Sequence, residues 1–145
     1  MPVAQINVLK GHSKAQLRAL LVDVSEAVAR VLNAPKDRLE IWINEVDPDL
    51  WGICGVPASE ALQDSTMAQI EMPFVQMALM EGRPLEQYHQ VIAEVTEAVA
   101  NATGATKSRI RVHIDSVKPD LWGIGGVPAA IVRAREIAER AGKAA

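Results

Sequence analysis

The proline at position 2 carries the most distinctive chemistry in this sequence. The initiator methionine is normally removed before a residue of this size, which would leave Pro2 as a secondary amine at the chain terminus. A terminal amine ordinarily titrates at about pH 8, and burial or nearby arginines lower its pKa because both disfavour the cationic form. A neutral amine at working pH can act as a general base. Pro2 is therefore the first candidate for a catalytic residue.

A second feature is an internal repeat with an offset of 71 residues, so that Pro73 is the counterpart of Pro2. The run DLWGI at residues 49–53 recurs unchanged at residues 120–124, and no gap is needed to align the two halves. Repeats of this kind indicate a supersecondary unit that is used twice.

Each repeat has the pattern of a strand, a helix and a second strand. Residues 3–9 form a short apolar run, and apolar side chains at steps of three and four over residues 17–32 are typical of an amphipathic helix. Ser13 followed by Gln16 predicts a capping box at the start of this helix. Residues 39–46 then alternate as a second strand does. The second repeat adds Pro84 just inside its helix start and Gly104 at its end.

The β-α-β order requires a right-handed crossover between parallel strands. Two units predict an α/β (α+β) fold, with a four-stranded sheet and two helices on one face. We expect one domain over residues 1–145, made of repeats at about 2–60 and 73–131, a linker at 61–72 and a C-terminal helical tail. We also expect aliphatic side chains on the uncovered face of the sheet, and hence oligomerisation.

Composition excludes several classes of function. The formal net charge of −3 argues against nucleic-acid binding through a basic surface. No apolar run reaches the roughly 18 residues that a membrane span needs, and the start of the chain lacks the features of a signal peptide, so we expect a cytoplasmic protein. Cys54 is the single cysteine, which excludes an intrachain disulfide, and we expect it to be a small buried hydrophobe.

Three segments resemble the tautomerase superfamily: residues 2–11, residues 24–27, and the Trp-Gly-Ile run before Gly55. Each half is similar to one whole subunit of 4-oxalocrotonate tautomerase, so the chain resembles a fused, tandem-repeat member of that family. The resemblance implies an isomerase with an N-terminal proline base, two arginines and an aromatic residue, and no metal or other cofactor. The short family members are hexamers, so a fused chain implies a homotrimer.

The two arginines implied by the family are present only in the second repeat. The first, after the glycine that ends the opening strand, is Arg83, and its counterpart in the first repeat is His12. The second, on the strand after the helix, is Arg111, and its counterpart is Glu40. We expect Pro2 to meet the arginines of the second repeat, from its own chain or from a neighbour. The other pocket would face Glu40 and His12.

The prolines and tryptophans are present in both repeats. Pro73 lies within the chain, so its nitrogen is an amide without a basic lone pair, and only Pro2 can serve as the base. Trp51 and Trp122 are the aromatic residues that would form an apolar pocket wall. We therefore expect three working sites per trimer rather than six.

These residues predict keto-enol isomerisation of a small carboxylate substrate, such as 2-hydroxymuconate or another 2-hydroxydienoate or 2-oxo acid. Arginine would bind the carboxylate through two parallel hydrogen bonds. Two alternatives remain open. If Pro2 stays cationic and a carboxylate such as Glu40 activates water, the same pocket would act as a hydratase, dehalogenase or decarboxylase on unsaturated or 3-oxo acids. Loss of the arginines from the first repeat also fits a non-catalytic trimeric scaffold, and His12 is a possible second acid-base group.

Overall fold

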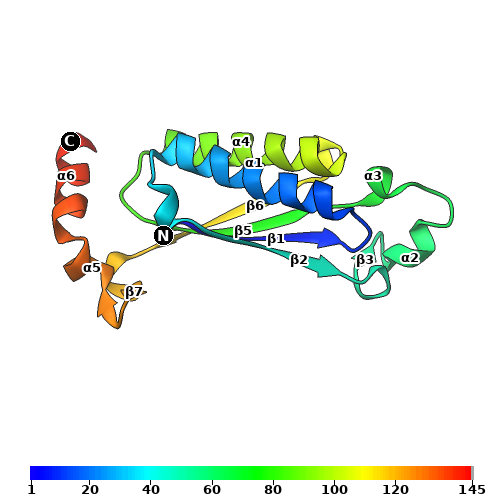
Figure 1. The fold of residues 1–145 in the computed structure, drawn as a ribbon, viewed down its shortest axis with the longest axis horizontal. Coiled ribbons are helices and arrows are strands. Elements are labelled where there is room, and N and C mark those ends of the chain that lie inside the picture. The colour runs from blue at the N-terminus through cyan, green and yellow to red at the C-terminus, as the bar shows by residue number, and fades with distance from the viewer. Residues whose placement is uncertain (145) are drawn as a thin grey trace.

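The computed structural model describes residues 1–144, and two β-α-β units share one sheet in it (Figure 1). This confirms the α/β fold class. The first unit contains β1 (Val3–Leu9), α1 (Lys14–Leu32) and β2 (Glu40–Val46). The second unit contains β5 (Phe74–Met80), α4 (Leu85–Thr103) and β6 (Arg111–Val117).

Local signals set the ends of the two long helices. The Ser13 hydroxyl accepts from the Gln16 N–H at 3.1 Å and the Gln16 side chain accepts from the Ser13 N–H at 3.0 Å, so the predicted capping box is confirmed. Asn33 and Gly104 end the helices in the left-handed conformation, with φ of 49° and 79°. Pro84 is the N-cap residue and lies just outside α4, one position earlier than predicted, because its φ and ψ are extended.

The strand order is β2-β1-β5-β6, with parallel pairs at the outside and an antiparallel pair in the centre. Val3 lies opposite Ala78 and Asn7 lies opposite Phe74. Each repeat therefore begins where the first strand of the other repeat ends. We call the two ends of the sheet the Pro2 end and the Pro73 end.

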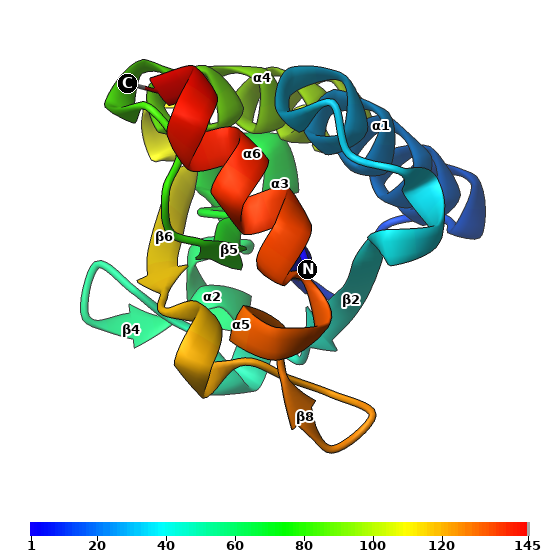
Figure 2. The same ribbon diagram turned by 90° about the vertical axis from the view of Figure 1, so that its left-hand side faces the viewer.

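Helices α1 and α4 lie side by side on one face of the sheet and form the main core with it (Figure 2). Alternate strand residues point into this core, as the period of two requires. The most deeply buried side chains of this core on the strands are Ala4, Ile6, Val8, Val75, Met77 and Leu79, and those on the helices are Leu20, Val24, Val28, Val91, Val95 and Val99.

The opposite face of the sheet is polar at its centre, so the expectation of an aliphatic face was wrong. Amide side chains bond across three strands: Asn44 donates to Gln5 at 3.0 Å and to Asn7 at 3.2 Å, and Gln5 donates to Gln76 at 2.6 Å. The alternation of each strand directs its aliphatic positions towards the helices and leaves these amides on the open side.

Short elements follow each unit. After β2 come the 3₁₀ turn η2 (Pro48–Leu50), the hairpin of β3 (Gly52–Ile53) and β4 (Val56–Pro57), and helices α2 (Ala58–Ala61) and α3 (Met67–Ile70). After β6 come η4 (Pro119–Leu121), the hairpin of β7 (Gly123–Ile124) and β8 (Val127–Pro128), and helices α5 (Ala129–Val132) and α6 (Ala134–Ala144). Turns η1 (Lys36–Arg38) and η3 (Lys107–Arg109) precede β2 and β6.

Cys54 is exposed in the first hairpin turn at a φ of 55°, so the expectation that it is buried was wrong; the tight turn directs it outward.

Helix α6 crosses the Pro2 end of the sheet and lies over the chain start (Figure 2). Within residues 1–144, no helix has both the length and the apolar character that crossing a bilayer requires.

Candidate functional site

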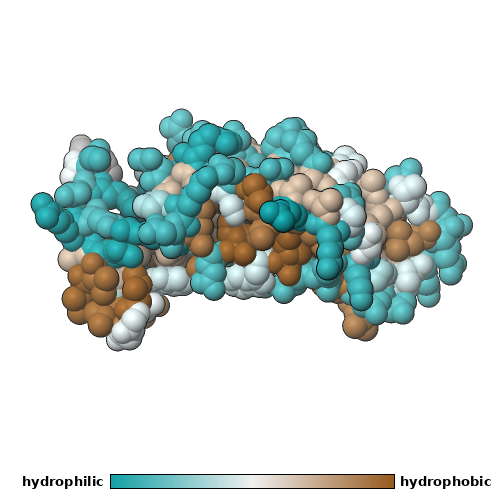
Figure 3. Space-filling model, viewed as in Figure 1, coloured by the Kyte–Doolittle hydropathy of each residue, from teal (hydrophilic) through white to brown (hydrophobic). Residues whose placement is uncertain are grey.

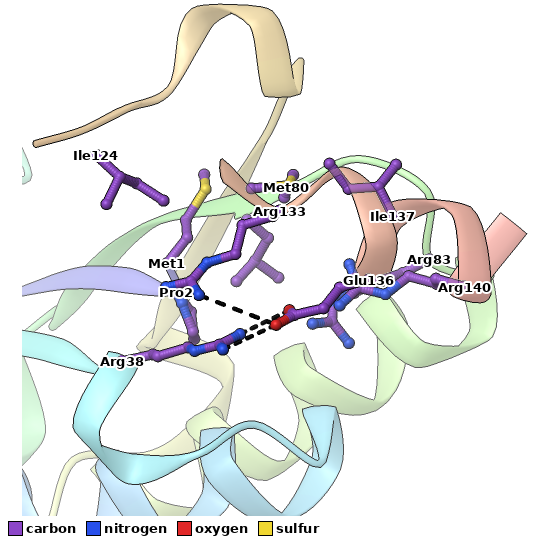
Figure 4. Close-up of a pocket in the computed structure, with 11 residues that line it drawn as sticks. Met1, Pro2, Arg38, Met80, Arg83, Ile124, Arg133, Glu136, Ile137 and Arg140 are labelled. Atoms are coloured by element: carbon purple, nitrogen blue, oxygen red, sulfur yellow. Dashed lines mark hydrogen bonds and ion pairs between the residues drawn. The ribbon is translucent and has the colours of Figure 1, made fainter. Parts of the chain in front are cut away.

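A cavity of about 40 Å³ lies at the Pro2 end, between the chain start, the end of β5 and helix α6 (Figure 4). It draws on both repeats and on the C-terminal tail, which is possible because the central strand pair is antiparallel. The lining residues are Met1, Pro2, Arg38, Leu79, Met80, Arg83, Ile124, Arg133, Glu136, Ile137 and Arg140.

Pro2 is buried at the start of β1, where its carbonyl accepts from the Glu40 N–H at 3.2 Å. Burial lowers the pKa of the Met1 amino group, and the charges of Arg133 and Arg38 lower it further, whereas Glu40 opposes them. The Pro2 nitrogen is the next nitrogen along the chain. Once freed by loss of Met1, it would face the same burial and the same arginines, which favour its neutral form.

Arg83 follows Gly82, whose φ of 105° turns the chain after β5 into the cavity. Its Nη1 donates to the Leu32 carbonyl at 3.2 Å and to Gln87 at 3.3 Å, and its buried Nε has no hydrogen-bond partner in the described part of the chain. Burial lowers the pKa of Arg83 to about 10, with a further contribution from Arg140. No carboxylate pairs with Arg83 in residues 1–144. A partly buried guanidinium without a counter-ion is a site that attracts an anion.

The carboxylate in this cavity is already engaged. Glu136 accepts two parallel bonds from Arg38, at 2.7 and 2.9 Å, and lies 3.9 Å from Arg133 (Figure 4). The hydrogen bonds from Arg38 lower the pKa of Glu136 below its ordinary value. Four guanidinium groups therefore surround one carboxylate among the lining residues, and the excess positive charge favours an anionic ligand.

The Pro73 end is filled by the linker between the repeats. His12 lies 2.9 Å from both carboxylate oxygens of the fully buried Glu71, which also accepts from the Leu9 N–H at 2.8 Å. Met67 packs on Gly11 so closely that a Cβ at Gly11 would collide with its methyl group. The linker thus occupies the pocket in which Pro73 would have been the base.

The structure places the remaining sequence candidates at different ends. Arg111 lies at the Pro73 end, exposed, with its Nη1 donating to the Ser108 carbonyl at 2.8 Å. Trp51 is at that end and packs on Leu9. Trp122 lies at the Pro2 end near the cavity, but Ile124 lines the cavity in its place.

Glu40 is the position at which the sequence reasoning needs correction. We expected it to face the second pocket together with His12, but Val3 pairs with Glu40 at the Pro2 end of the sheet. The parallel pairing of β1 and β2 separates the two residues, because it puts the start of β2 beside the start of β1, whereas His12 follows the end of β1.

Sequence reasoning missed the contribution of the tail. Residues 136, 137 and 140 recur at helical spacing and so share one face of α6, and Arg133 directly precedes this helix. That spacing was visible in the sequence, but its direction towards Pro2 was not. Arg38 was missed as well, although its counterpart Arg109 is also an arginine; Arg109 holds the linker by donating to the Ile70 carbonyl at 2.8 Å.

The His12–Glu71 pair predicts a pH dependence of stability. The hydrogen bond from Glu71 raises the pKa of His12 and outweighs burial, which lowers it. A raised pKa contributes stability that is complete below the unfolded value of about 6.5 and is lost as pH rises through the folded value. We expect the melting temperature of the unsubstituted protein to exceed that of His12→Asn most at pH 6, and the gap to shrink towards pH 9. A gap that is constant with pH would contradict the assignment.

Comparisons with known proteins agree with this architecture. A family model described as "Tautomerase enzyme" matches residues 2–61 and 73–130, which are the two repeats. The 2-hydroxymuconate tautomerase of Pseudomonas putida is 42% identical over 60 residues, covering 41% of this chain and 95% of that protein. A native fused 4-OT crystal structure matches with a TM-score of 0.79 at 25% identity, covering 92% of this chain and 98% of that one. A fused 4-OT solved as a symmetric trimer has a TM-score of 0.78 at 21% identity, covering 92% and 99%.

Proposed function

Because this chain belongs to the tautomerase family and is an isomerase, we propose that it isomerises a small 2-hydroxydienoate or 2-oxo acid, with the amine of Pro2 as the general base. One observation carries the proposal: the cavity that holds the buried Pro2 also holds Arg83, a guanidinium with no carboxylate partner within residues 1–144. A base and an anion site in one cavity are what proton transfer on a carboxylate substrate requires.

The proton transfer is balanced within the substrate. The Pro2 nitrogen removes the proton of the 2-hydroxyl group, and the electrons of that O–H bond form the ketone. The displaced double-bond electrons move to a distant carbon, which receives the proton back from the prolyl ammonium. Arg83 binds a carboxylate throughout, and a neighbouring guanidinium stabilises the negative charge that develops on oxygen. The name of the Pseudomonas putida relative makes 2-hydroxymuconate the first substrate to test.

Loss of Met1 would also provide space. A cavity of about 40 Å³ holds little more than one water molecule, and Met1 is part of its wall. Removing this residue would uncover the Pro2 nitrogen and enlarge the cavity in the same step. The test is to compare turnover of 2-hydroxymuconate by protein with and without Met1, as argued in the Discussion.

We further propose that three chains assemble. A fused 4-OT of the same fold was solved as a trimer, and exposed apolar side chains gather beneath α5 and β7 at one end of the molecule (Figure 3). The exposed apolar residues of η4, β8 and α5 are Leu121, Val127, Ile131 and Val132, and their counterparts in the first repeat include Leu50 and Val56. A neighbour in such an assembly could bring its Arg111 to the Pro2 cavity.

Light scattering of the purified protein is therefore expected to give three times the 15.7 kDa chain mass at micromolar concentration. Exposed apolar surface of this kind is normally buried against another chain. A mass equal to one chain would contradict the trimer and would leave Arg111 without a route to Pro2.

A second candidate function is favoured by the position of Glu40. Its carboxylate raises the pKa of the terminal amine, and a cationic Pro2 would act as an acid in hydration, dehalogenation or decarboxylation. Burial, Arg133 and Arg38 each lower this pKa by more than Glu40 raises it, so the neutral base is favoured. Glu40→Gln is expected to leave isomerisation nearly unchanged; a loss as large as that of Arg83→Ala would favour the second candidate.

A further inference from the structure

The linker and the C-terminal tail occupy equivalent positions in the two repeats, since Glu71 and Gly142 are one repeat length apart. At the Pro73 end, the linker places the Glu71 carboxylate against His12 at 2.9 Å. At the Pro2 end, the tail lies over Arg83, which is the counterpart of His12, but it has no carboxylate at the matching position. The Glu71 carboxylate therefore fills the anion position beside His12, whereas the matching position of the tail beside Arg83 is Gly142 and holds no carboxylate.

The tail instead places a cation beside Arg83. Arg140 lines the Pro2 cavity together with Arg83, and both also line an adjoining hollow of about 220 Å³ (Figure 4). The ion pairs of α6 join Glu136 to Arg38 and Arg133, and Arg135 to Glu139; Arg140 takes part in none of them within residues 1–144. The positive charge of Arg140 contributes to the lowered pKa of Arg83, so the two groups interact.

Two guanidinium groups that face one cavity repel each other unless an anion lies between them. Side chains as long as arginine on a surface helix normally avoid such a position by turning to solvent. Helix α6 is held in place by the two bonds between Arg38 and Glu136, at 2.7 and 2.9 Å. The Glu136 carboxylate also attracts Arg140, but both of its oxygens accept from Arg38. The fold therefore holds two guanidinium groups at one cavity, and a bound carboxylate would relieve their repulsion.

We propose that Arg140 is a second substrate-binding residue of this pocket, sharing a substrate carboxylate with Arg83. This inference rests on the proposed function, and it adds to the site a residue from outside the two family-matched segments, 2–61 and 73–130. Helix α6 is then a wall of the pocket that selects for anionic substrates. The Glu136–Arg38 pair acts as a positioning contact that holds this wall against Pro2.

The test measures binding separately from turnover. The full chain without Met1 is titrated calorimetrically with cis,cis-muconate, a six-carbon dicarboxylate that has no 2-hydroxyl proton to remove, and is assayed in parallel on 2-hydroxymuconate. Arg140→Gln is compared with Arg135→Gln, since Arg135 lies on the same helix with a side chain 94% exposed and an ion pair to Glu139. Arg140→Lys tests whether charge at this position is what matters.

Arg140→Gln is expected to weaken muconate binding and to raise KM by roughly tenfold, the effect of losing one charge-assisted contact, with a smaller change in kcat. Arg135→Gln should bind as the unsubstituted protein does, and Arg140→Lys should recover part of the affinity. Equal affinities of Arg140→Gln and Arg135→Gln, or no muconate binding by the unsubstituted protein, would overturn the inference. If muconate binding depends on Arg140 but 2-hydroxymuconate is not turned over, the proposed function fails and the inference stands.

Discussion

Protein that keeps Met1 is expected to have no measurable turnover of 2-hydroxymuconate. With Met1 attached, the Pro2 nitrogen is a tertiary amide with no basic lone pair to accept a proton, and Met1 also lines the cavity that we propose as the substrate site. General-base catalysis is worth roughly 10²- to 10⁴-fold, and exclusion of the substrate adds to that loss. The comparison requires intact-mass measurement of both samples, so that each activity is assigned to a defined terminus.

Substitutions at the two prolines provide the controls. Pro2→Ala keeps a primary amine once Met1 is removed, so only part of the activity should be lost. Pro73 is internal and its end of the sheet is filled by the linker, so Pro73→Ala should leave kcat and KM nearly unchanged, with at most a small loss of stability from a freer unfolded chain. A Pro73→Ala loss comparable to that of Pro2→Ala would mean that both ends of the sheet take part.

Replacing Arg83 with Ala is expected to lower kcat/KM on 2-hydroxymuconate by roughly 10- to 100-fold. A hydrogen bond to a charged group contributes about 1.5–3 kcal/mol, and 1.4 kcal/mol corresponds to a factor of ten. Arg83 lines the Pro2 cavity, partly buried and without a carboxylate partner among residues 1–144, and we propose that its charge binds the substrate. Steady-state kinetics at several substrate concentrations gives the loss.

Arg30→Ala is the matched control for Arg83→Ala. Arg30 is exposed and pairs with Glu94 at 2.8 Å on the outer side of the helices, where an ion pair contributes little. Because Arg83 also donates to the Leu32 carbonyl, thermal unfolding of each variant must show that the fold is retained. Equal kinetics for the two variants would show that Arg83 does not bind the substrate. His12→Ala should resemble Arg30→Ala in activity, since Glu71 occupies the pocket of His12.

Most of the fold could be predicted because its signals are local. The capping box at Ser13, the helical period and the left-handed stop at Asn33 act within a few residues, and the repeat provides each signal twice. The polar open face was missed because judging it requires knowing which strand positions point away from the helices. The outward direction of Cys54 was missed for a similar reason, since it depends on a two-residue turn.

The sequence pattern of a repeat identifies candidate site residues within that repeat, but it does not show which residues of the other repeat or of the tail lie beside them. Arg83 could be identified from the glycine before it, but its place beside Pro2 depends on the antiparallel register of β1 and β5. Parallel pairing with β1 puts Glu40 at the Pro2 end, and the antiparallel register then puts Arg111, which pairs beside Phe74, at the other end. The contribution of α6 depends on contacts between residues about a hundred positions apart, such as that of Arg38 with Glu136.

The most direct test of the central claim is a pH titration of the Pro2 nitrogen, followed by its NMR chemical shift in ¹⁵N-proline-labelled protein without Met1, together with the pH profile of kcat/KM. We predict a pKa below that of an unperturbed prolyl amine, because burial and the arginines of the cavity disfavour its charged form. We also predict that kcat/KM rises with pH through the same value and then levels off, as it must when the neutral amine is the base. A kcat/KM that does not change across the measured pKa of Pro2 would contradict the account.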